Sequence, residues 1–142
     1  MTTYNIFYDS NKSIVWSTTA DISDGIKTAQ SDLGYSHVAL DIADDIQPDD
    51  NYYLNSDATA LVEKSIFDFT FSNTTPALDE VVNVTGLPSG TRVFIDGVSK
   101  ATMDDTTLTL TIQECGVYKV VFSKLHYKKH SGTKLIIKRY GE

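Results

Sequence analysis

The side chains best suited to acid–base or metal chemistry are few: three histidines and one cysteine in a chain of 142 residues. His126 and His130 stand four residues apart, a spacing that on a helix would let both bind one metal ion. They lie between two expected strands, however, and next to Lys128 and Lys129, whose charges disfavour a cation. His37 falls on the polar side of its expected strand and should face solvent. We therefore expect no catalytic residues, no metal site and no cofactor.

Acidic side chains and the lone cysteine give two further candidates for chemistry. The aspartates at positions 41, 44, 45, 49 and 50 could supply oxygen ligands for calcium. This stretch lacks the alternating ligands, the central glycine and the terminal glutamate of an EF-hand loop, so a solvated acidic loop is favoured over a weak surface calcium site. Cys115 stands at the edge of an expected strand and is interpreted as a small buried side chain rather than a reactive thiol.

Charge is distributed unevenly along the chain. The formal net charge is −7, which argues against a nucleic-acid groove. Residues 1–80 carry 14 acidic and 3 basic side chains, a net charge of −11, whereas residues 81–142 carry 5 acidic and 9 basic, a net charge of +4. Such halves could associate head to tail between copies, although separate solvated faces on a monomer are the preferred interpretation. Since apolar runs such as 135–137 are too short to cross a bilayer, no membrane partner is expected.

The first half of the sequence predicts strands and one short helix. Residues 4–8 and 13–18 are rich in aromatic and β-branched side chains and flank a cluster of turn formers, which is typical of a hairpin. Residues 36–42 alternate apolar and polar side chains, as a half-buried strand does. Residues 51–54 and 60–64 predict a second hairpin. The single helical stripe, which precedes Gly34, consists of Ile22, Ile26, Ala29 and Leu33.

The second half predicts strands alone. Residues 66–72 contain three phenylalanines two positions apart, whose rings should face one way and anchor a core. Asp96 and Gly97 between two short strands indicate a tight hairpin turn, and residues 107–112 alternate threonine with large apolar side chains. Evenly spaced strands without intervening helices favour an antiparallel β-sandwich. We place a boundary within residues 72–81, which gives a β-rich α+β module at 1–75 and a β-sandwich module at 76–142.

Three aromatic residues are the candidate binding residues. Tyr52 and Tyr53 are adjacent in an expected strand, so they must point to opposite sides. One is expected in the core and the other at the surface, where it could anchor a partner. Trp16, in the first hairpin, is the third candidate.

The last 60 residues carry recognisable motifs. The stretch Gly-Leu-Pro-Ser-Gly-Thr-Arg-Val-Phe-Ile-Asp-Gly at 86–97, followed by Gly-Val-Tyr-Lys-Val-Val-Phe at 116–122 and by Leu-His-Tyr at 125–127, resembles the small immunoglobulin-like modules of tailed-bacteriophage virion proteins and bacterial surface proteins. The N-terminal strand and hairpin patterns look like short phage structural proteins encoded among head and tail genes. One departure is the segment 124–126, Lys-Leu-His, where a glycine or proline usually stands.

The resemblance implies a non-enzymatic structural protein of a tailed-phage virion. Such a protein is made in the host cytoplasm and is located in the virion, where it docks on the capsid or tail as a decoration or cement protein or as a tail- or fibre-associated protein. The implied partners are other virion proteins of the capsid or tail, with the chain present as a homo-oligomer or in many copies. In this hypothesis the acidic module docks through Tyr52, Tyr53 and Trp16, and the immunoglobulin-like β-sandwich is displayed.

Two other classes of function compete with this hypothesis. A carbohydrate-binding or adhesive surface module is the alternative, with Tyr52, Tyr127 and Tyr140 as its aromatic candidates. A small hydrolase is disfavoured, because no nucleophile, base and orienting group can be assembled from the sequence.

Overall fold

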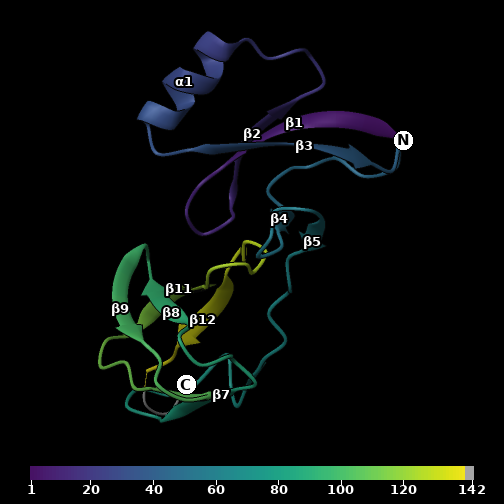
Figure 1. Ribbon diagram of the computed structural model, residues 1–142. Coiled ribbons are helices and arrows are strands. Elements are labelled where there is room, and N and C mark those ends of the chain that lie inside the picture. Colours follow the sequence, from purple (N-terminus) through teal and green to yellow (C-terminus); the bar gives the residue numbers. More distant parts are fainter. Residues whose placement is uncertain (140–142) are drawn as a thin grey trace. The chain divides into compact units, whose positions relative to one another are not determined.

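A computed structural model describes residues 1–139 of the chain. The chain divides into two compact units, Met1–Ser65 (unit 1) and Ile66–Glu142 (unit 2), each with its own hydrophobic core. The described residues form twelve strands, paired into several antiparallel sheets, and one helix (Figure 1). The prediction of a mainly β protein with one short helix is therefore confirmed.

Unit 1 is built on a three-stranded antiparallel sheet. Its central strand β1 (Thr2–Tyr8) pairs with β2 (Ile14–Thr18) on one side and with β3 (Ser36–Ile42) on the other. The predicted N-terminal hairpin is confirmed. Ile6 and Phe7, neighbours in β1 that point to opposite faces, are both fully buried, so both faces of this sheet are covered.

One face of the sheet packs on a hairpin and the other lies under the helix (Figure 1). The hairpin, β4 (Tyr52–Leu54) and β5 (Leu61–Glu63), contributes Leu54 and Leu61 to the core around Ile6. The opposite face carries Phe7 and the residues paired with it, and α1 (Asp24–Asp32) lies over it. Unit 1 thus has a helix, a sheet and a hairpin in successive layers.

The helix α1 ends before Gly34, as the sequence predicts, but it begins after Ile22 and does not bury the predicted apolar stripe. Ser23 caps it by accepting a hydrogen bond from the Ile26 amide, and Gly34 follows it with φ 88°. No residue of α1 is buried: Ile26 is 42% exposed and Leu33, just beyond the helix, is 67% exposed. The helix is fastened instead by a polar contact from Gln30, described below.

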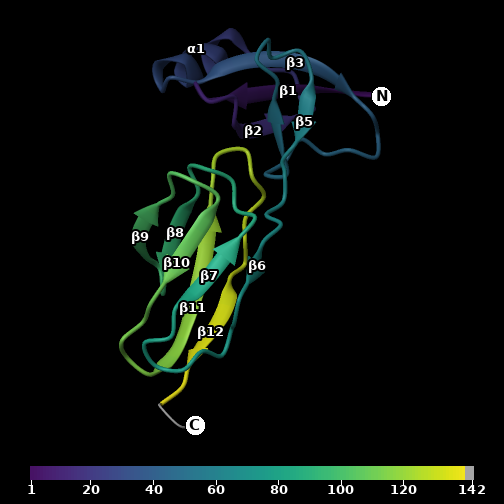
Figure 2. The same ribbon diagram turned by 90° about the horizontal axis from the view of Figure 1, so that it is seen from below.

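Unit 2 consists of two antiparallel sheets that share one core (Figure 2). The three-stranded sheet has the order β10 (Thr107–Leu110), β7 (Val82–Thr85), β6 (Thr70–Phe71). The four-stranded sheet has the order β12 (Thr133–Ile137), β11 (Gly116–Ser123), β8 (Arg92–Ile95), β9 (Val98–Thr102). Both sheets contribute buried side chains to the core, which consists of Val82, Val84, Leu87, Val93, Met103, Leu108, Leu110, Val120, Phe122, Leu135 and Ile137.

The two units divide between Ser65 and Ile66, ten residues before the boundary placed from the sequence. The three phenylalanines of residues 66–72 explain the difference. Phe67, Phe69 and Phe71 pack against the core of unit 2, as their predicted core role requires. The segment that carries them therefore belongs to unit 2.

Residues 73–76, Asn-Thr-Thr-Pro, interrupt the strand pattern where the boundary was placed, but they lie inside unit 2 because the chain changes sheets there. Before it, β6 pairs with β7. After it, the backbone runs beside β12: the Ile136 amide donates to the Thr74 carbonyl at 2.9 Å and the Lys138 amide to the Pro76 carbonyl at 2.9 Å. This stretch looks like a linker in the sequence, but it joins a part of the chain that pairs with β7 to a part that pairs with β12.

Two turn glycines differ in what surrounds them. In the Asp96–Gly97 turn both residues have positive φ, 50° and 81°, as the sequence predicts for a two-residue hairpin loop. A Cβ added at Gly97 would meet nothing within 4 Å. Gly86 has a φ of +91°, and a Cβ there would lie 2.7 Å from the Asp68 carbonyl oxygen.

We expect Gly86→Ala to destabilise unit 2 more than Gly97→Ala. Both variants place a side chain at positive φ, which costs about 1–2 kcal/mol. Gly86→Ala must in addition displace the backbone of Asp68, which should raise its total cost to about 3 kcal/mol. Urea unfolding of both variants measures the difference, and equal losses would contradict the close approach at Gly86.

Candidate interaction surfaces

Trp16, one of the three predicted binding residues, makes its polar contact inside unit 1. Its ring stacks on Phe7 with centroids 4.4 Å apart and an interplanar angle of 16°, and its indole N–H donates to Gln30 Oε1 at 3.0 Å. Trp16 is half-buried, and through Gln30 it fastens α1 over the sheet. The structure gives this residue a supporting role in the fold.

Tyr52 and Tyr53 lie on a different element from Trp16, although Tyr53 forms an isolated β-bridge with Ser13, just before the strand that carries Trp16. They stand in β4, opposite Glu63 and Val62 of β5, on the hairpin that packs against the other face of the sheet. Both are half-buried, so neither is the fully buried member expected of the pair. Trp16 thus packs on the face of the sheet under α1, whereas Tyr52 and Tyr53 belong to the hairpin on the opposite face.

His37 is half-buried, although the sequence predicts a solvent-facing side chain. Its Nε2 lies 2.9 Å from Asn5 Oδ1, and its ring lies against Phe7 with centroids 5.0 Å apart. Burial, and next the positive charge of Lys27 on α1, lowers the pKa of His37 below its usual 6.5. Its polar strand face is covered because α1 lies over it.

His130 belongs to the aromatic core of unit 2. Its ring stacks on Phe122 at 5.2 Å with an interplanar angle of 11°, and the Phe122 amide donates to His130 Nδ1 at 3.2 Å. Since Nδ1 accepts, the proton of the neutral ring lies on Nε2, which is 3.4 Å from Thr133 Oγ1. Burial, followed by the charge of Lys119, lowers the pKa of His130 below 6.5.

Unit 2 should lose stability as the pH falls below about 6.5. Because its pKa is lowered in the folded state, His130 binds a proton more readily in the unfolded chain, and acid therefore favours unfolding. We expect the melting temperature of unit 2 to drop between pH 7.5 and pH 5, and to drop less in His130→Asn, which keeps an acceptor for the Phe122 amide. An unchanged pH dependence in that variant would contradict this role.

Cys115 and the acidic loop complete the candidates for chemistry. Cys115 is exposed, so the expectation of a buried side chain is wrong. It lies between β10 and β11, where no strand directs its side chain toward the core. Among residues 1–139, no three His, Cys, Asp or Glu side chains are arranged to hold a metal ion.

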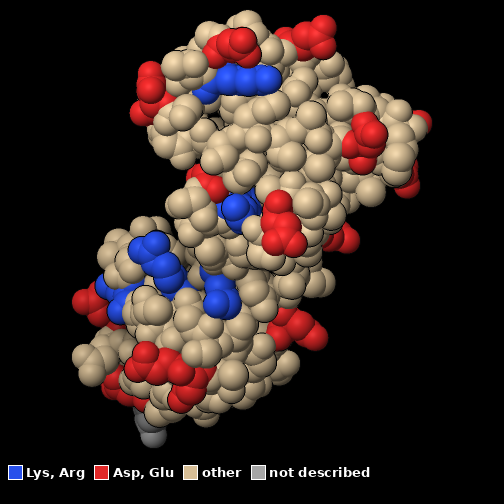
Figure 3. All heavy atoms as spheres, viewed as in Figure 1, with Lys and Arg blue, Asp and Glu red and all other residues tan. Residues whose placement is uncertain are grey.

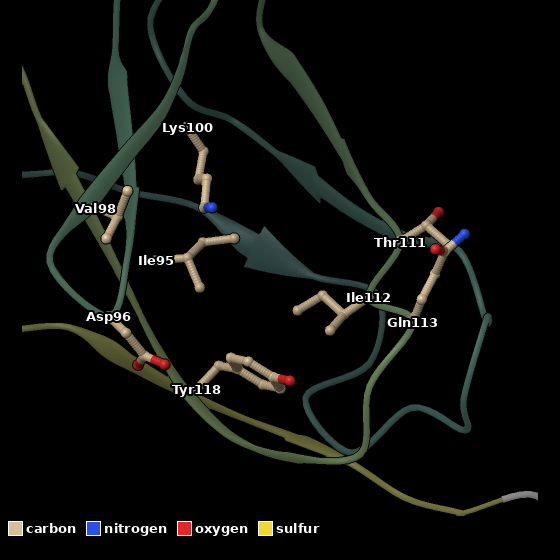
Figure 4. A pocket seen from close by; sticks show the side chains of 8 residues that line it. All are labelled: Ile95, Asp96, Val98, Lys100, Thr111, Ile112, Gln113 and Tyr118. Carbon is tan, nitrogen blue, oxygen red and sulfur yellow. The ribbon is translucent and has the colours of Figure 1, made fainter.

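A hollow of about 540 Å³ opens in unit 2 between the two sheets (Figure 4). Four of its lining side chains are apolar or aromatic and four are polar or charged, and among the latter Lys100 reaches into it from β9. Its volume lies in the range of sites that hold a ligand or a partner's side chain. The lining residues are Ile95, Asp96, Val98, Lys100, Thr111, Ile112, Gln113 and Tyr118.

The hollow lies beside an open sheet edge. β9 is the last strand of its sheet, and no strand within residues 1–139 pairs with its outer edge. All five of its residues are exposed, and Val98, which lines the hollow, is 56% exposed. The other wall comes from residues 111–113, which follow the edge strand β10 of the second sheet. An extended segment could pair with β9 and place an apolar side chain in the hollow.

The two units differ in net charge. Unit 1 carries 11 acidic and 3 basic side chains, a net charge of −8, whereas unit 2 carries 8 acidic and 9 basic, a net charge of +1. In Figure 3, basic side chains gather over the part of unit 2 where Figure 1 draws β8, β9 and β11. Four of the nine basic residues of unit 2 lie in the strands of the four-stranded sheet: Arg92, Lys100, Lys119 and Lys134.

Of the aromatic residues suggested for carbohydrate binding, Tyr127 has contacts within unit 2. Tyr127 is half-buried and stacks on Phe67 at 4.8 Å, so one face of its ring is occupied. Tyr52 lies in unit 1, and Tyr140 lies outside the described residues.

Comparison with family models, with curated proteins and with solved structures gave no significant match to the chain. Among the described residues, no helix is long and apolar enough to span a membrane.

Proposed function

We propose that this chain is a non-enzymatic structural protein of a tailed-phage particle. It is made in the host cytoplasm, is present in the virion in several copies, and docks on the capsid or tail through protein–protein contacts. The sequence motifs at 86–97 and 116–122 support this proposal by their resemblance to phage virion modules.

We also infer that unit 2 is an immunoglobulin-like β-sandwich, and its strand order supports this. Counted within the unit, its first, second and fifth strands form one sheet, and its seventh, sixth, third and fourth strands form the other. This order matches strands A, B and E packed against G, F, C and C′ of that fold. The unit has no disulfide, so its core alone must hold the sheets together.

The observation that carries the proposed function is the hollow beside the free edge of β9. Its inner wall is formed by Ile95, Ile112 and Tyr118, which also pack against the core and so give a fixed surface. A segment of a neighbouring virion protein would add to β9 by backbone hydrogen bonds and fill the hollow with an apolar side chain. An acidic residue in that segment would meet Lys100. In this proposal unit 2 docks, because Trp16 is engaged within unit 1.

Val98→Asp tests this docking site. The variant places a carboxylate where the partner's apolar side chain should lie, at a position exposed enough to leave the core intact. In particles produced by phage that lack the wild-type gene and receive the variant in trans, we expect the copy number of the chain to fall about tenfold or more. Quantitative mass spectrometry of purified particles measures it.

Val81→Asp is the matched control. Val81 is 53% exposed, lies in the same unit and does not line the hollow. The copy number of Val81→Asp in the particles should equal that of the wild type. Circular dichroism should show that both variants are folded. Equal incorporation of all three chains would contradict docking through the hollow.

A further inference from the structure

The outer face of the four-stranded sheet in unit 2 carries a mixed cationic and apolar surface. Because Val93, Val120, Phe122, Leu135 and Ile137 point into the core, their strand neighbours point outward. Those outward residues, which we call the cationic face, are Arg92, Phe94, Lys119, Val121, Lys134 and Ile136. The face thus alternates basic and apolar side chains across three strands.

No ion pair among residues 1–139 balances the lysines of the cationic face, although the Asp96 carboxylate accepts a hydrogen bond from the Lys119 backbone amide at 2.9 Å. Lys119 and Lys134 stand directly opposite each other in β11 and β12, a like-charge pair that destabilises a sheet. None of the strands β8, β9, β11 and β12 contains an acidic residue. Neither lysine forms an ion pair with any residue in the described part of the chain. An acidic surface placed on this face would relieve the repulsion.

The apolar residues on the face favour a protein as its partner. Phe94, Val121 and Ile136 are half-buried, and the Arg92 guanidinium lies 5.3 Å from the centre of the Phe94 ring. Protein interfaces combine aromatic and apolar residues with arginine in this way, whereas a phosphate backbone is bound chiefly by polar and basic groups.

Unit 1 has the complementary charge. Its net charge is −8, and its loop after β3 exposes Asp45 and Asp50, which make no hydrogen bond with any residue in the described ranges. The neighbouring Asp41 and Asp44 are already engaged by Thr3 and by Thr2. The carboxylates of Asp45 and Asp50 therefore remain available to a partner.

We propose that the cationic face of unit 2 binds the acidic surface of unit 1 in a second copy of this chain, so that copies associate head to tail. Two cationic faces could not pair with each other, because lysines would meet lysines. The interface therefore joins unlike surfaces and can continue from copy to copy. This inference goes beyond the proposed function and does not depend on it.

Sedimentation velocity of the full chain tests self-association. In about 20 mM NaCl the average mass should rise above 15.7 kDa with protein concentration, and in about 500 mM NaCl it should return to that of the monomer, because salt screens the attraction. A chain that is monomeric at all concentrations in low salt would overturn the proposal.

Charge reversals distinguish the two surfaces. Lys134→Glu should weaken self-association about tenfold or more, yet leave the melting temperature of unit 2 unchanged or higher, because a glutamate then faces Lys119. The double variant Asp45→Lys/Asp50→Lys should weaken it similarly. Mixed together, the two variants should associate again, since each retains the surface that the other has lost.

Lys100→Glu is the control, with the same change in charge at a residue that faces the hollow. It should associate as the wild type does, so loss of association in this variant would overturn the proposal and assign the contact to the hollow. Failure of the mixture to associate would also overturn it. A monomeric wild type that binds an oligonucleotide through Lys134 would overturn it in favour of nucleic acid.

Discussion

Phe122→Ala should lower the free energy of unfolding of unit 2 by about 3–5 kcal/mol, the range for truncating a fully buried phenylalanine. Phe122 is 1% exposed, and its ring lies 5.0 Å from Phe69 and 5.2 Å from His130 between centroids. Removing it leaves a cavity where the two sheets and the segment before β7 meet. Residues 67–71, whose three phenylalanine rings contact Phe122, would lose this contact with the core.

Two optical signals separate the units in this experiment. Trp16 is the only tryptophan and lies in unit 1, so its fluorescence follows the unfolding of unit 1, whereas far-ultraviolet circular dichroism follows both units. Phe122→Ala should shift the urea transition of unit 2 and leave the tryptophan transition in place. Phe94→Ala, at a half-buried position on the outer face, should cause a clearly smaller loss. An equal shift of both signals would contradict two units with separate cores.

Trp16→Ala should destabilise unit 1 by about 2–3 kcal/mol, less than for a fully buried tryptophan because the ring is half-buried. The variant removes the stack on Phe7 and the hydrogen bond to Gln30, so α1 loses its attachment to the sheet. Thermal unfolding followed by circular dichroism measures the loss.

Two conservative variants test which contact matters. Trp16→Phe keeps part of the stack and Gln30→Ala removes only the hydrogen-bond partner, so each should cost less than Trp16→Ala, about 1 kcal/mol for Gln30→Ala. If Trp16 instead served to dock unit 1 on a partner, Trp16→Ala would leave stability unchanged and reduce particle incorporation. That outcome would contradict the supporting role.

Local patterns in the sequence predicted the elements that depend on local interactions. The first hairpin, the position of α1 and the Asp96–Gly97 turn follow from side-chain alternation, capping residues and positive φ. Periodicity could not show that Ile26 and Leu33 remain exposed, because it indicates which side chains share a face but not whether another element covers that face.

Features that depend on distant pairing could not be predicted. The break at 73–76 resembles a linker, because the pairing of this segment with β12 joins residues about sixty positions apart. The hollow is lined from two segments, 95–100 and 111–118, that only the packing of two sheets brings together. The opposition of Lys119 and Lys134 depends on the register of β11 and β12. The sequence of β9, Val-Ser-Lys-Ala-Thr, contains no apolar side chain larger than valine, and this is the sequence feature that could have indicated an edge strand.

If a tailed phage encodes this chain, as we propose, the most direct test is the protein composition of purified particles of that phage. If the chain is a virion component that acts through contacts, mass spectrometry of gradient-purified particles should detect peptides from both units at a constant ratio to the major capsid protein. Recovery of the chain only from the soluble fraction of infected cells, with none in the particles, would contradict the proposal.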